Sequence, residues 1–170
     1  MEVIHFILRI VQLIFLIILT GLIGNVIALD VSASTSARAA INFTMFVIAL
    51  SWVAALFGLA AAVFQRIAVP LVMLIFDAAA VLFTLISGIV LAAKLGTPDC
   101  GNILDDQYGH KWIAYGSAND AKRCKEIQAG TVFMWLLLAA FSAALTLAIM
   151  SWRRTGGSVR SKPTMSQVAV

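Results

Sequence analysis

Two pairs of residues in this chain have types and positions that suit chemistry. Arg9 and Asp77 carry opposite charges, and each lies inside a long run of apolar residues. Cys100 and Cys124 are the only two cysteines, and both lie in one polar stretch of the sequence. A charge in apolar surroundings is costly unless it is paired, and two nearby cysteines can form a disulfide. These residues therefore offer an ion pair and a covalent cross-link, and their role depends on the elements that carry them.

Composition indicates what those elements are. The chain has 170 residues, of which 62% are hydrophobic and 12% charged, and its mean hydropathy is +1.00. Since charged residues make up about a quarter of a soluble domain, so much apolar surface must be covered by lipid. Crossing a bilayer takes about 20 apolar residues, and four runs of the sequence are long enough. We predict an all-α integral membrane protein, a four-helix bundle with spans at about 3–29, 40–65, 69–93 and 127–152, an outer loop at 94–126 and a tail at 153–170.

Four spans place both termini on one side of the membrane. The Lys and Arg counts of the two sides are equal, so the positive-inside rule depends on context. The tail 153–170 has four basic residues and no acidic one, whereas the outer loop balances its basic residues with acids. A Cys100–Cys124 disulfide closing the base of that loop is expected in an oxidising compartment. We therefore expect cytosolic termini and an extracellular or lumenal loop, with free thiols or lipidated cysteines on a cytosolic loop as the alternative.

Arg9 and Asp77 enter the membrane from the same side. Arg9 lies six residues beyond Val3, or about 9 Å deep, and Asp77 lies eight residues beyond Val69, or about 12 Å deep, at the rise of an α-helix. They are the only ionisable residues well inside the predicted spans. Charged residues in membranes usually pair or face the bundle interior. We therefore predict an ion pair between the first and third helices.

Two alternatives to this pair remain open. The long side chain of Arg9 can reach the headgroups of its own leaflet, which leaves Asp77 neutral and hydrogen-bonded to a backbone carbonyl, Thr84 or Ser87. Asp77 can also be the protonatable group of a transporter. Each alternative leaves the two charges apart.

Small residues on the second helix predict close helix packing. Ala54, Gly58 and Ala62 recur at every fourth position and form one predicted stripe. Small side chains matter in lipid because they let helix backbones approach. The stripe fits packing within one protomer or contact with a second copy.

The order of several short motifs resembles a known family. These are ILRI at Ile7–Ile10, the pattern PLV…FD…FT…G…VLA from Pro70 to Ala92, Cys100 with Arg123-Cys124, and PTMSQV at Pro163–Val168. Together they resemble the fungal non-classical export protein 2 family, four-helix membrane proteins of the MARVEL-domain class. The resemblance covers nearly the whole chain and keeps the order of the motifs.

The resemblance implies a non-enzymatic organiser of the plasma membrane. Its members are expected in sterol-rich, furrow-like domains called eisosomes, where they respond to sphingolipid status, and they are linked to export of proteins without a signal peptide. The implied partners are sterol, sphingolipid, other membrane proteins of the domain and a further copy of the chain, with neither a cofactor nor a nucleic acid.

The tail suggests a further lipid contact. Its basic residues can attract anionic lipids of the cytosolic leaflet with about 1 kcal/mol each, and hydroxyl residues among them are candidate phosphorylation sites. The basic residues are Arg153, Arg154, Arg160 and Lys162, and the hydroxyl residues are Ser158, Ser161, Thr164 and Ser166.

Two other classes of function compete with an organiser. A proton-coupled transporter built on Asp77 needs a polar path, for which the spans offer only Gln12, Asn25 and scattered hydroxyls. An enzyme needs a base beside its nucleophile, yet the spans hold no Cys and no second carboxylate, and the two histidines, His5 and His110, are expected at opposite membrane faces. The sequence also shows no phosphate-binding, dinucleotide or zinc motif. We therefore expect no catalytic site and no metal site.

Overall fold

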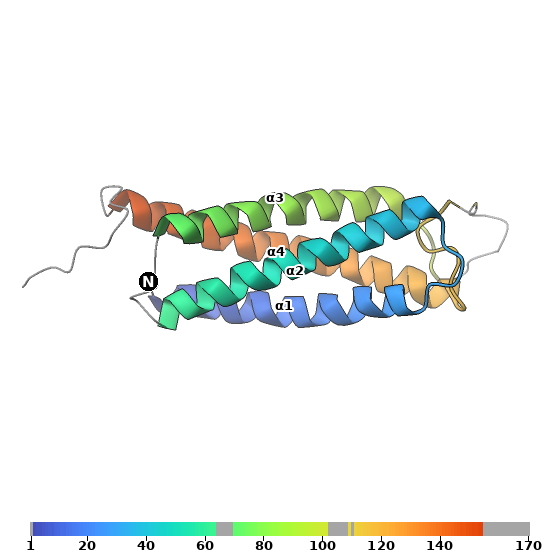
Figure 1. The fold of residues 1–170 in the computed structure, drawn as a ribbon, viewed down its shortest axis with the longest axis horizontal. Coiled ribbons are helices and arrows are strands. Elements are labelled where there is room, and N and C mark those ends of the chain that lie inside the picture. The colour runs from blue at the N-terminus through green and yellow to red at the C-terminus, as the bar shows by residue number, and fades with distance from the viewer. Residues whose placement is uncertain (1, 64–69, 102–108, 110, 155–170) are drawn as a thin grey trace, which may run out of the picture.

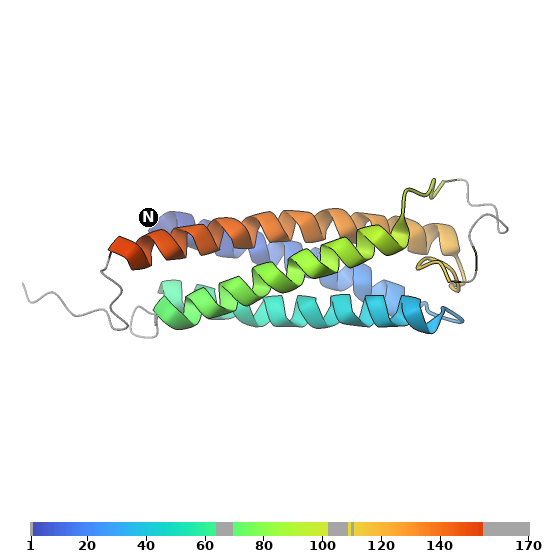
Figure 2. The same cartoon turned by 90° about the horizontal axis from the view of Figure 1, so that it is seen from above.

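The computed structural model describes residues 2–63, 70–101, 109 and 111–154. These residues form four long antiparallel helices (Figures 1 and 2). Each helix is long and apolar enough to cross a membrane, which confirms the predicted all-α, four-span bundle. The helices are α1 (Glu2–Ala28), α2 (Thr35–Val63), α3 (Pro70–Leu95) and α4 (Asp120–Arg154).

Two helices begin earlier than their apolar runs. The Ser34 hydroxyl accepts a hydrogen bond from the Ala37 amide at 3.2 Å, so α2 begins at Thr35 instead of near residue 40. The Asn119 side chain accepts one from the Lys122 amide at 2.9 Å, so α4 begins at Asp120 instead of near residue 127. Such N-caps satisfy free amides at a helix start. Hydropathy marks only the lipid-embedded part of a helix, which explains the difference.

The four helices form a square in which each has two neighbours. Both α1 and α3 pack against α2 and α4, and they lie diagonally opposite each other. One end of the bundle carries the start of α1 and the end of α4, and we call it the terminal end (Figure 1). The opposite end carries the α1–α2 turn and the segment between α3 and α4, and we call it the loop end.

The outer surface and the core are both apolar, as lipid requires. Side chains such as Ile17, Ile75 and Val132 are more than half exposed and face outward. Fully buried side chains such as Leu16, Leu91 and Leu137 fill the space between the helices.

The loop end is closed by a cap made of the α1–α2 turn and residues 111–119. The amides of Val31 and Ser32 donate hydrogen bonds to the Gly116 carbonyl at 3.0 and 2.9 Å. Gly116 has a φ of +92°, and a Cβ there would lie 2.5 Å from the Ala33 amide nitrogen. This close approach of two backbones requires glycine. Ile113 in the cap is completely buried.

A disulfide joins the chain just after α3 to α4. Cys100 follows the end of α3 and is bonded to Cys124, with 5.6 Å between their Cα atoms. Cys124 lies on α4 and not in a loop as its sequence position indicated, because α4 begins before the apolar run. Closing a loop of this size stabilises a fold by roughly 3 kcal/mol in the chain-entropy account. The disulfide therefore links the residues that follow α3 to the first turns of α4.

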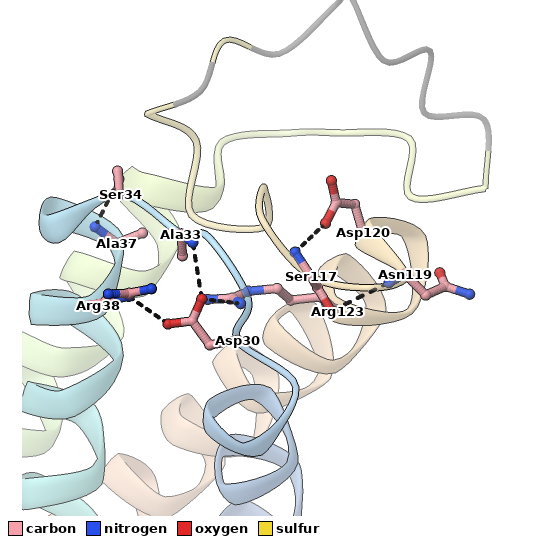
Figure 3. Close-up of polar contacts among 9 residues, drawn as sticks. All are labelled: Asp30, Ala33, Ser34, Ala37, Arg38, Ser117, Asn119, Asp120 and Arg123. Atoms are coloured by element: carbon pink, nitrogen blue, oxygen red, sulfur yellow. Dashed lines mark hydrogen bonds and ion pairs between the residues drawn. The ribbon is translucent and has the colours of Figure 1, made fainter.

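Asp30 is the charged centre of the cap (Figure 3). Its carboxylate accepts hydrogen bonds from the Ala33 amide at 3.0 Å and from Arg38 Nε of α2 at 2.7 Å. Arg123 Nη1 of α4 lies 3.4 Å from the same carboxylate. Burial raises the pKa of Asp30, but the Ala33 amide, Arg38 and Arg123 outweigh burial and hold this pKa below its ordinary value of 3.8. Asp30 thus ties the α1–α2 turn to α2 and α4.

The cap should lose stability in strong acid through Asp30. Because the folded pKa is lowered, the stabilisation is present above pH 3.8 and is lost as the pH falls through the folded pKa. We expect Asp30→Asn to lower the stability at neutral pH by on the order of 1–3 kcal/mol and to reduce the acid-dependent loss. Thermal unfolding of the purified chain in micelles, measured from neutral pH down to strong acid, checks this.

Asp99→Asn is the matched control. Asp99 is exposed, and its carboxylate accepts a hydrogen bond from the Gly101 amide at 3.0 Å within its own loop. The stability of Asp99→Asn should fall with pH in the same way as that of the unaltered chain. An Asp30→Asn variant with the same acid profile as the unaltered chain would contradict the assigned role of Asp30.

Candidate functional site

Helical periodicity points Arg9 and Asp77 into the bundle. On α1, Arg9 shares a face with the buried residues Gln12, Leu16 and Leu19. On α3, Asp77 is followed at spacings of three and four by the buried residues Ala80, Thr84, Ser87 and Leu91. Residues three and four apart lie on one face of a helix. Each charge therefore belongs to the face that its helix buries.

The structure brings the two charges together. Arg9 Nη1 donates to Asp77 Oδ1 at 2.8 Å, and Arg9 Nη2 donates to Asp77 Oδ2 at 2.6 Å. The two side chains are only 2% and 1% exposed. Parallel hydrogen bonds of this kind fix the geometry as well as the charge pairing. Since α1 and α3 are diagonal in the bundle, the pair crosses its centre.

Gln12 extends this polar layer to α4. Its Oε1 accepts a hydrogen bond from Arg9 Nη1 at 2.9 Å, and its Nε2 donates to the Ala140 carbonyl at 3.3 Å. Gln12 is completely buried. One further partner for the guanidinium thus comes from α1 itself, and α4 is held through a backbone carbonyl.

Gly58 makes room for the guanidinium on α2. A Cβ at Gly58 would overlap Arg9 Nε and Cζ, and it would lie 2.7 Å from Nη2. The side chain of Arg9 therefore rests against the α2 backbone. Side chains or backbone from all four helices meet in this one layer, and we call it the ion-pair layer.

The ion-pair layer lies near the end of the core. Among the described residues, none of residues 4–8 of α1, 71–76 of α3 or 145–153 of α4 is buried. In the same region of α2, Ala61 is buried. The core on the loop side of the layer, by contrast, contains fully buried side chains from every helix. On α1 and α3, the layer therefore holds the buried side chains nearest the terminal end among the described residues.

The geometry differs from the alternative in which Arg9 reaches the headgroups and Asp77 bonds to a nearby hydroxyl. The Thr84 hydroxyl donates to the Ala80 carbonyl at 2.6 Å, and the Ser87 hydroxyl donates to Thr44 Oγ1 at 3.1 Å. Neither hydroxyl contacts Asp77. Arg9 turns inward instead of reaching towards the headgroups of its leaflet.

The predicted stripe of small residues is partly wrong. Ala54 and Gly58 are buried, but Ala62 is exposed, and Ala61 is buried instead. The reason is the helical repeat of 3.6 residues. Two steps of four residues rotate away from the starting face, while a step of seven returns close to it. The buried face continues from Ala54 to Ala61.

The tail residues are largely outside the described part of the chain. Arg153 is exposed in the last turn of α4, and Arg154 is the last residue of that helix. The remaining predicted lipid contacts and phosphorylation sites lie outside the described residues, and they are Arg160, Lys162, Ser158, Ser161, Thr164 and Ser166.

Sequence reasoning missed two features of these sites. It treated Gly58 as a packing residue and did not connect it with Arg9, because a glycine carries no chemical signal of what lies against it. It also missed the contacts of Asp30 with Arg38 and Arg123, since Arg123 is distant in the sequence. An acid directly after an apolar run was the available signal for Asp30.

Comparison with known proteins agrees with this architecture. The family model MARVEL, described as a membrane-associating domain, matches residues 2–147. The chain belongs to the MARVEL family. Its membership places it among four-span membrane proteins that are generally not enzymes.

Two proteins of Saccharomyces cerevisiae resemble this MARVEL chain along most of its length. Non-classical export protein 2 is 30% identical over 169 residues, which cover 96% of this chain and 92% of the relative. Non-classical export protein 2 homolog 1 is 28% identical over 150 residues, which cover 88% of this chain and 81% of the relative. No solved structure matches the chain.

A double-mutant cycle measures the coupling between Arg9 and Asp77. We expect Arg9→Leu and Asp77→Leu each to cost about 3–5 kcal/mol, because each leaves one buried charge unpaired. The double variant should cost less than the sum, with a coupling energy of about 1–3 kcal/mol. Reversible unfolding in mixed micelles provides the free energies. Additive costs would show that the two side chains do not interact.

Gly58→Ala tests the contact between α2 and the guanidinium. The added methyl must displace Arg9 from Asp77, and overpacking of this kind typically costs about 1–3 kcal/mol. The control is Gly24→Ala, since a Cβ at Gly24 has no atom within 4 Å and alanine favours a helix over glycine. The midpoint of thermal unfolding should fall for Gly58→Ala only. Equal midpoints for the two variants would contradict the described layer.

Proposed function

We propose that this MARVEL protein is a non-enzymatic organiser of sterol- and sphingolipid-rich domains of the plasma membrane. The observation that carries the proposal is the length of its apolar helices. The spans Ile4–Ala28 and Leu71–Leu95 have 25 residues each, which corresponds to about 38 Å along the helix axis. The hydrocarbon core of an average bilayer is about 30 Å thick, and sterol-rich plasma membranes are thicker. Long spans favour the thicker membrane.

The distribution of apolar side chains supports a lateral role. Large hydrophobic side chains are exposed on all four helices, for example Ile14, Val53, Ile89 and Leu136. A protein with most of its surface in lipid interacts mainly with lipids and with other membrane proteins. The chain is also similar to a protein named for non-classical export, and a link to that export belongs to the same proposal.

The interior favours an organiser over a transporter. Both carboxylate oxygens of Asp77 are bonded to Arg9, so this carboxylate has strong partners already. On the loop side of the ion-pair layer the core contains the fully buried side chains Leu16, Leu19 and Phe141. Tightly packed apolar side chains oppose the passage of a polar solute.

The proposed orientation places the termini in the cytosol and the disulfide outside. A disulfide persists in oxidising compartments, and here Cys100 and Cys124 are bonded at the loop end. Arg153 is exposed at the terminal end, where it can contact anionic lipids of the cytosolic leaflet together with the basic tail. Phosphorylation of the tail would weaken this contact, because it adds negative charge.

Localisation before and after sphingolipid depletion tests the proposal. A fluorescently tagged chain should concentrate in sterol-rich domains of the plasma membrane and should redistribute when sphingolipid synthesis is inhibited. The purified chain should also unfold at a higher temperature in long-chain than in short-chain phosphatidylcholine bilayers, because its spans match the thicker hydrocarbon. Uniform distribution in both conditions, with no dependence on bilayer thickness, would contradict the organiser role.

A flux assay separates the organiser from the transporter. Liposomes that contain the unaltered chain should show the same proton flux as empty liposomes. Flux that depends on the chain and disappears in Asp77→Asn would favour the transporter instead.

A further inference from the structure

The two ends of the bundle are held by different kinds of interaction. At the loop end, the disulfide, the backbone hydrogen bonds to Gly116 and the contacts of Asp30 connect three helices and the cap. Towards the terminal end, the Arg9–Asp77 pair joins α1 and α3 across the bundle. The Phe57 and Phe76 rings, with centroids 5.5 Å apart, join α2 and α3 next to the ion-pair layer.

The helix ends beyond the ion-pair layer present apolar side chains outward. Ile4, Ile7, Val63 and Ile75 are each more than half exposed. Their apolar nature does not pull these ends together, because lipid tails are as apolar as the side chains and helix association in lipid has no hydrophobic driving force. The attraction between oppositely charged Arg9 and Asp77 acts in a medium of low dielectric constant, where it is strong.

These observations indicate a hinge. Arg9 and Asp77 are the buried residues of α1 and α3 nearest the terminal end among the described ones, and beyond them these two helices continue for about 10 Å. We propose that the loop end is a fixed hinge and that the terminal end opens and closes with the lateral pressure of the surrounding lipid chains. The Arg9–Asp77 pair is the link that sets the distance between α1 and α3 at the terminal end in the closed state.

The acyl chains of the leaflet around the terminal end act as the ligand that shifts this equilibrium. A ligand shifts a conformational equilibrium only through a difference in its interaction with the two states. The closed and open states differ in the area that the helix ends occupy in one leaflet. Lipids with small headgroups crowd the chain region and favour the closed state, and lipids with one chain relieve that crowding and favour the open state. The inference requires only a membrane-spanning bundle, so it stands or fails separately from the proposed plasma-membrane role.

Distances between spin labels on α1 and α3 test the inference at both ends. The only two native cysteines form the disulfide, so introduced cysteines can be labelled selectively. Labels at Ile4→Cys and Leu71→Cys report on the terminal end, and labels at Ile27→Cys and Ala92→Cys report on the loop end. All four positions are exposed. Pulsed electron paramagnetic resonance in bilayers gives the distance distributions.

The terminal-end distance should depend on lipid composition. Added lysophosphatidylcholine should shift it to longer values, and added phosphatidylethanolamine should shift it to shorter values, while the loop-end distance stays constant. A terminal-end distance that is the same in both lipids would overturn the inference, and so would equal shifts at both ends.

Variants test whether the ion pair sets the terminal-end distance between α1 and α3. The double variant Arg9→Leu with Asp77→Leu leaves no lone charge, and its terminal-end distribution should broaden and shift to longer distance while the loop-end distribution is unchanged. Gly58→Ala keeps both charges and should give a smaller shift of the same sign. Asp30→Asn is the reciprocal control and should broaden only the loop-end distribution. A terminal-end distance distribution that is unchanged in both the double variant and Gly58→Ala would show that the ion pair does not set this distance.

Discussion

The ion pair between Arg9 and Asp77 is the interaction on which this structure depends most. A bilayer supplies no hydrophobic force between helices, and it penalises an unpaired charge. The ion pair supplies an attraction between two diagonal helices, and each charge removes the penalty for burying the other. Gln12 and Gly58 complete the layer, one by a hydrogen bond to the guanidinium and the other by leaving space for it. Four apolar helices thereby acquire one defined arrangement.

The loop end is held together by different interactions. It lies beyond the most apolar part of the spans, where charged residues and polar backbone are less costly. Asp30 can therefore pair with Arg38 and Arg123, and Gly116 can accept backbone hydrogen bonds from the α1–α2 turn. A disulfide adds a covalent link that does not depend on the solvent. One end of the bundle is consequently fixed by a disulfide and by the polar contacts of the cap, and α1 and α3 are joined near the other end by the ion-pair layer.

Much of this architecture could be predicted from the sequence, for identifiable physical reasons. Hydropathy defined four spans because lipid exposure leaves few charged residues in a helix. The similar depths of Arg9 and Asp77 pointed to contact between helices that are distant in the sequence. Local capping by Ser34 and Asn119 was missed because hydropathy does not register a helix start outside the lipid. Ala62 was placed wrongly because a four-residue repeat departs from the helical period.

The central claim is that Arg9 pairs with Asp77 inside the bilayer instead of with lipid phosphate. Solid-state NMR of the labelled chain in lipid bilayers tests this by dipolar coupling between the guanidinium nitrogens of Arg9 and the carboxyl carbon of Asp77. The Arg38–Asp30 pair is an internal reference, since its shortest distance between nitrogen and oxygen is 2.7 Å. We predict a coupling for Arg9 and Asp77 at least as strong as this reference, which Asp77→Asn weakens. Coupling of the Arg9 nitrogens to lipid phosphorus, with none to Asp77, would contradict the account.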